Sequence, residues 1–193
     1  MAFNINNFKG AMDRGGVRQN LFEVNFDPSG GSRQGDDIVP FMCQATSLPS
    51  SDIGAIPVPY FGRTIFLAGD RTFSPWSVNI INDAAFAIRS QLENWHNRLN
   101  NRSQNTRATR YRSAEAYKID ATVTQFNAQR QVLKKYKFIG AFPITIGDIA
   151  LSWADNNAIE TFPVTFQYDY WEIDNNDFST ISEAPLAGIT VQS

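Results

Sequence analysis

The chain has few of the side chains that carry out chemistry. Among its 193 residues, only Cys43 is a cysteine and only His96 is a histidine. A disulfide within one chain is therefore impossible, and a zinc site built from cysteine and histidine in one chain is excluded. His96 has no second residue at a recognisable spacing for general base catalysis, and no serine motif suggests a Ser-His-Asp triad. We expect no catalytic residue, no metal site, no cofactor and no enzymatic activity.

Charge and long apolar runs are also scarce. Charged residues make up 19% of the chain, against a usual figure of about 25%, while aromatic residues reach 13%. No window approaches the roughly 20 apolar residues of a membrane-spanning helix, and the start does not resemble a signal peptide. We expect synthesis in a cytoplasm and no membrane anchor. The low charge suits a chain that covers its surface with neighbours, and it equally suits a β-rich monomer with an aromatic core.

Basic residues are missing from the last part of the chain. All 17 Lys and Arg lie at or before Lys137, whereas 8 of the 19 acidic residues follow it. Residues 1–137 hold 17 basic and 11 acidic side chains, a net charge of +6, and residues 138–193 have a net charge of −8. A basic face on one copy could meet an acidic face on the next, or the two signs could mix within one subunit.

Apolar and polar residues alternate along much of the chain, which predicts strands. The segments are 20–26, 38–48, 76–81, 117–124, 131–139, 149–153 and 159–171, with turns at Gly69-Asp70 and at 145–148. No repeat or linker divides the chain, so we expect a mobile arm at 1–19, one domain at 20–172 and an acidic tail at 173–193. These elements, with one helix, fit a mainly β fold: a β-sandwich or partly open barrel with one flanking α-helix.

The helix is expected to begin after Asn82 or Asp83 and to end near Asn100, because both side chains can accept the free amide hydrogens of a helix start. Its apolar residues recur at steps of three and four as one stripe, comprising Ala85, Ile88, Leu92, Trp95 and Leu99. The residues expected to mark the core of the domain are Trp76, Ile88, Leu92, Trp95, Trp153, Phe166 and Trp171.

Residues 49–62 mix apolar side chains with prolines, which predicts an extended arm or a sheet edge. Exposing the apolar residues would be costly, so the arm packs on its own domain or on another subunit. For Asp70-Arg71 a local turn and an ion pair across a subunit boundary are both open. The candidate subunit-interface residues are Ile53, Ile56, Val58, Tyr60, Phe61, Asp70 and Arg71.

Residues 117–139 predict a long hairpin that turns at Asn127-Ala128, with lysines on the exposed face of its return strand. The arginine-rich segment 100–116 predicts an exposed loop or subunit contact. A nucleic-acid patch is less favoured there, because only Tyr111 offers a stacking surface.

Several short segments, in order, resemble the tail tube proteins of T4-like contractile-tailed bacteriophages. They are residues 20–24, 43–49, 56–58, 68–99, 150–153, 155–157, 161–165 and 169–172. The resemblance implies a virion protein that assembles into hexameric rings with a continuous inner β-barrel, stacked into a tube inside a contractile sheath. The sequence of this chain departs from the family pattern at 100–116 and in the tail after 172.

The same resemblance implies partners and a lumen. The partners would be further copies of the chain and the tail sheath, baseplate and tail terminator proteins, and DNA would pass through the lumen without sequence-specific binding. The hairpin residues that could contribute to the lumen wall are Thr122, Thr124, Asn127, Lys135 and Lys137. A tube initiator or baseplate-junction protein, the tube of a related injection or secretion particle, and a soluble β-sandwich ligand-binding module remain alternatives.

Overall fold

The computed structural model describes residue 5 and residues 17–27, 39–154 and 156–174. Most of the predicted N-terminal arm and acidic tail lies outside these residues. The described elements are β1 (Phe22–Asn25), α2 (Val39–Met42), β2 (Cys43–Thr46), β3 (Asp52–Tyr60), β4 (Arg63–Thr72), β5 (Trp76–Ile81), α3 (Ala87–Leu99), η1 (Thr109–Tyr111), η2 (Ala114–Ala116), β6 (Ile119–Phe126), β7 (Val132–Ile146), β8 (Thr161–Gln167) and β9 (Tyr170–Ile173). The fold is mainly β with one long helix, as predicted. In the described part of the chain, no helix has the length and apolar character needed to cross a membrane.

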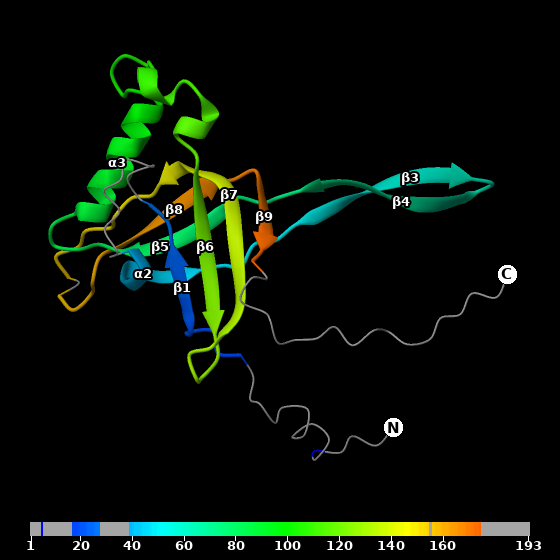
Figure 1. Cartoon of the computed structure of the whole chain (residues 1–193), viewed down its shortest axis with the longest axis horizontal. Helices are drawn as coiled ribbons and strands as arrows, with labels where there is room; N and C mark the ends of the chain where they lie inside the picture. Colours follow the sequence, from blue (N-terminus) through cyan, green and yellow to red (C-terminus); the bar gives the residue numbers. More distant parts are fainter. Residues whose placement is uncertain (1–4, 6–16, 28–38, 155, 175–193) are drawn as a thin grey trace.

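The body of the molecule is a seven-stranded antiparallel sheet that folds over on itself (Figure 1). Its strand order is β1-β6-β7-β8-β5-β2, and β9 also pairs with β7. The long strand β7 bends at Gly140, which has a left-handed φ of 68°. Before the bend β7 pairs with β9, and after it β7 pairs with β8. The sheet therefore forms two layers, β1-β6-β7-β9 and β7-β8-β5-β2, which share β7.

The core lies between these layers and under α3. The Trp76 ring of β5 stacks on the Phe138 ring of β7, with 4.4 Å between centroids, and so connects the layers. From α3, Trp95 lies 6.4 Å from the Phe166 ring of β8. Of the expected core residues, five are buried and one is half-buried against the core: Trp76, Ile88, Leu92, Trp95 and Phe166, then Trp171.

The expectation that Trp153 belongs to the core is wrong, and so is the strand predicted around it. Trp153 is fully exposed, at 103%. β7 continues to Ile146, so the turn predicted at 145–148 does not form as such, and residues 147–154 and 156–160 contain no strand. The neighbouring strand β8 already pairs with β7 on one edge and β5 on the other, so it has no free edge for another strand.

Three other element boundaries differ from the prediction. The α3 helix begins at Ala87, where the backbone N–H donates to Asp83 Oδ1 at 2.9 Å, so Ala85 precedes the helix and is exposed. The segment predicted as one strand at 38–48 contains α2 and then β2. The final strand is divided into β8 and β9, which pair with β7 on either side of its bend. Between them, the Asp169 backbone N–H donates to the Ile139 carbonyl oxygen at 3.0 Å.

Candidate assembly surfaces

Strands β3 and β4 form a long hairpin that projects from the body of the molecule (Figure 1). The two strands pair from Asp52↔Thr72 to Tyr60↔Arg63, and nearly every residue of both is exposed. Exposed large apolar side chains cover it: Ile53, Ile56, Val58, Tyr60, Phe61, Ile65, Phe66 and Leu67. A two-stranded hairpin is marginal on its own in water, and so large an apolar patch marks an interaction site.

The hairpin turns at Phe61-Gly62, where both residues have positive φ, 43° and 77°. This is the backbone of a two-residue turn that fits the twist of paired strands. Phe61 is 91% exposed at the tip, and its ring packs against the Tyr60 ring with 4.7 Å between centroids. An aromatic side chain is therefore presented at the end of the hairpin.

The turn predicted at Gly69-Asp70 is wrong, because both residues lie inside β4. A Cβ atom at Gly69 would lie 3.0 Å from the Gly54 carbonyl oxygen and 3.1 Å from Ile56 Cγ1. Glycine therefore favours the close approach of two strands here rather than a turn. Arg71 lies opposite Ile53 at the base of the hairpin. No ion pair of Asp70 or Arg71 occurs among the described residues, and an ion pair to another subunit stays a prediction.

A second surface is the outer face of the β1-β6-β7-β9 layer. The pairings Thr122↔Lys137 and Thr124↔Lys135 put these four side chains on the face opposite Val123 and Phe138. This polar face also includes Glu172, which lies opposite Lys137. Asn127 is instead at the β6–β7 turn, where its Oδ1 accepts hydrogen bonds from the Gln129 and Gln131 backbone N–H groups.

The lysines of this polar face lie beside acidic groups. Lys137 Nζ is 2.9 Å from Asp120 Oδ2, and Lys135 Nζ is 3.3 Å from Asp174 Oδ2. The hydrogen bond and charge of Asp120 raise the pKa of Lys137 above its ordinary value. The face is therefore polar with both signs of charge, rather than the cationic face expected from the lysines alone.

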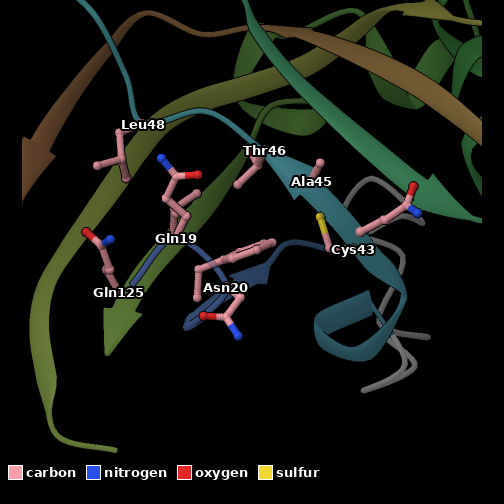
Figure 2. Close-up of a pocket in the computed structure, with 10 residues that line it drawn as sticks. Gln19, Asn20, Cys43, Ala45, Thr46, Leu48 and Gln125 are labelled. Atoms are coloured by element: carbon pink, nitrogen blue, oxygen red, sulfur yellow. The ribbon is translucent and has the colours of Figure 1, made fainter. Parts of the chain in front are cut away.

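The outer strands of the polar layer, β1 and β9, each pair on one side only within the described residues. Strand β2, at the end of the other layer, lies near β1 without pairing with it. Figure 2 shows the groove beside these strands, with Asn20, Cys43 and Gln125 among its lining residues. Its volume is about 760 Å³. Burial raises the pKa of the Cys43 thiol to about 12, so the thiol stays protonated at neutral pH.

The remaining polar segments provide no cluster of chemical groups. His96 lies on α3, and in the described residues no group of three or more His, Cys, Asp or Glu side chains could hold a metal ion. In the arginine-rich segment, Tyr111 is buried and its hydroxyl oxygen accepts a hydrogen bond from Arg98 Nη1 at 3.1 Å. The ring therefore offers no stacking surface for a base.

Comparisons with known proteins agree with this arrangement. The model of the family described as "Phage tail tube protein" matches residues 8–174. The chain belongs to this family. It is 37% identical to the "Tail tube protein gp19" of Enterobacteria phage T4 and to that of Enterobacteria phage T6. Each match covers 157 residues, which is 81% of this chain and 91% of the relative.

The fold is also similar to that of a solved structure. A chain in the cryo-EM structure titled "Extracellular Contractile Injection System, PVC sheath/tube terminator in extended state" superposes with a TM-score of 0.60 and 16% sequence identity. The match covers 82% of this chain and 96% of that chain. At this identity the similarity concerns the fold alone.

Proposed function

We propose that this chain is a structural virion protein that builds the inner tube of a contractile phage tail. Copies close into hexameric rings, and the rings stack into a tube that conducts the genome. The observation that carries this proposal is the exposed apolar hairpin β3–β4 on a subunit whose polar layer, in the described part of the chain, has free edges at β1 and β9. These are the features of a subunit that is completed by its neighbours.

Ring closure is supported by the direction of the strands. The layer β1-β6-β7-β9 has four strands, and each neighbouring pair is antiparallel. Strand β9 therefore runs opposite to β1, and β9 of one copy can pair antiparallel with β1 of the next. Repeating this contact around a ring joins the polar layers into one continuous inner barrel and removes the two free edges of this layer.

The polar face suits the wall of the lumen. Within it the charges of Lys135 and Lys137 are largely balanced by Asp174, Asp120 and Glu172. Affinity for DNA depends mainly on cations that neutralise phosphates, so a balanced face binds DNA weakly and without regard to sequence. Weak binding is what a conduit requires.

The outer surface and the two ends of the tube would contact the sheath, the baseplate and the tail terminator. A tube initiator or baseplate-junction protein of the same fold is the alternative, because the same fold can serve either role. The two candidates differ in copy number: a tube protein forms long polymers, whereas an initiator forms a single ring.

Electron microscopy of the purified chain tests the proposal. We expect rings and hollow tubes, with six copies per ring by mass measurement. Rings that never stack would identify the initiator instead. A chain that stays monomeric at high concentration across buffers would overturn both candidates.

A further inference from the structure

The loop between β7 and β8 carries three large apolar side chains exposed to solvent. Trp153 is 103% exposed, Leu151 is 79% exposed and Ile159 is 74% exposed. Leu151 and Ile159 also line a hollow of about 300 Å³ in this loop. The walls of the hollow are both polar and apolar, and the exposed Trp153 follows Ser152, which is one of its lining residues. An exposed tryptophan next to such a hollow is the kind of site where interface energy concentrates. We refer to these three residues as the loop patch.

The loop patch and the hairpin lie at opposite ends of the molecule. Figure 1 shows the tip of β3–β4 at one end of the long axis, and the loop between β7 and β8 at the other. Two different apolar surfaces at opposite ends make a head-to-tail contact possible. Such a contact repeats without limit along an axis.

The charges at the two ends are complementary. Arg63 is the charged residue nearest the hairpin tip, opposite Tyr60, and it makes no ion pair among the described residues. The loop instead carries acidic residues and no basic residue, with Asp148 exposed and Glu160 beside the hollow. Opposite charges at the rim of an apolar contact favour encounter in one orientation.

From these observations we infer that the loop patch is the receptor for the hairpin tip of a second copy. The Phe61 ring enters the hollow beside Leu151 and Ile159, Trp153 covers the tip, and Arg63 faces Asp148. This assignment rests on the proposed tube role and deepens it, because it names both sides of the contact between successive rings.

Variants of the full chain test the assignment by separating the two sides. Phe61→Asp disrupts the hairpin tip, and Trp153→Asp disrupts the loop patch that receives it. We expect each variant alone to lose tube formation in electron microscopy and sedimentation velocity. A mixture should form complexes of two layers and no longer species, because only one productive contact is left. Trp153→Phe should still form tubes.

Gln104→Asp, which adds the same charge on an exposed loop after α3, is the matched control and should form tubes as the unchanged chain does. The fold of each variant is intact if its melting temperature equals that of the unchanged chain when both are measured below the concentration at which tubes form. Tubes of normal length from Trp153→Asp would show that the loop patch is not the receptor for the hairpin tip. The proposed tube role would be unaffected by that result. A mixture with no two-layer complex would overturn the head-to-tail pairing. If the unchanged chain forms no tubes, the proposed function fails instead.

Charge exchange gives an independent test of orientation. Arg63→Glu and Asp148→Lys should each slow elongation roughly tenfold at low salt, and the double variant should recover most of the rate. A double variant as slow as the single variants would show that the two charges do not face each other.

Discussion

Replacing Gly140 by alanine perturbs the bend that divides β7 between the two layers. Its φ of 68° costs an L-residue about 1–2 kcal/mol. The new Cβ would also lie 2.5 Å from Asp169 Oδ2, and because this carboxylate is half exposed and can move, the clash costs about 1 kcal/mol. The Lys118–Asp169 ion pair, at 2.6 Å, is partly exposed and adds about 1 kcal/mol at most when displaced. We expect a loss of about 3 kcal/mol in the free energy of unfolding.

Urea denaturation measures this loss in a background that does not assemble, because assembly would add a concentration-dependent contribution to stability. For a domain of this size the midpoint of thermal unfolding should fall by about 6–12 °C. In an Asp169→Ala background the carboxylate is gone, and Gly140→Ala should cost only the backbone part, about 1–2 kcal/mol. An equal cost in both backgrounds would refute the argument that Asp169 occupies the space of a side chain at this bend.

Three further predictions concern the surfaces and the core. Ile56→Asp should stop tube growth, and at concentrations too low for assembly its melting temperature should equal that of the unchanged chain, since the side chain is exposed. Normal growth by light scattering would contradict the hairpin contact. Trp153→Ala should change the free energy of unfolding by less than about 0.5 kcal/mol, because the side chain is exposed. Trp95→Ala should lower it by about 3–5 kcal/mol, because that side chain is buried. Similar losses for the two variants in urea denaturation would contradict this difference in burial. The pKa of Lys137 is raised from 10.5, so its contribution to stability is complete below the unfolded pKa and is lost as the pH rises through the folded pKa. Asp120→Asn should return that pKa toward 10.5 in an NMR titration, and an unchanged value would contradict the assigned cause.

The core could be predicted from the sequence where alternation and helical spacing agree with burial. Ile88, Leu92 and Trp95 follow the helical period, and all three are buried on the face of α3 that packs on the core. Phe162, Val164 and Phe166 alternate along β8 and are buried. These patterns work because each element buries one face against its own subunit.

The same patterns fail where an apolar face is not buried within the subunit. Ile149, Leu151 and Trp153 alternate as a buried strand would, yet they lie in a loop beside a strand whose two edges are already paired. Alternation reports which side chains share a face and does not show that a strand partner is available.

The sequence does not predict the return strand of the hairpin, β4, for a related reason. Gly69-Asp70 has turn composition, but Gly69 serves the close approach of β4 to Gly54. The exposed residues Ile65, Phe66 and Leu67 therefore lie outside the interface that the sequence predicts. The signal that could have identified them is Phe61-Gly62, a two-residue turn between extended apolar segments.

Cryo-EM reconstruction of assembled particles tests the central claim most directly. We predict rings in which β9 of each subunit pairs with β1 of the next, with Lys135 and Lys137 facing the lumen and the β3–β4 hairpin contacting the adjacent ring. A particle whose polar layers face outward, or whose hairpins contact nothing, would contradict the account.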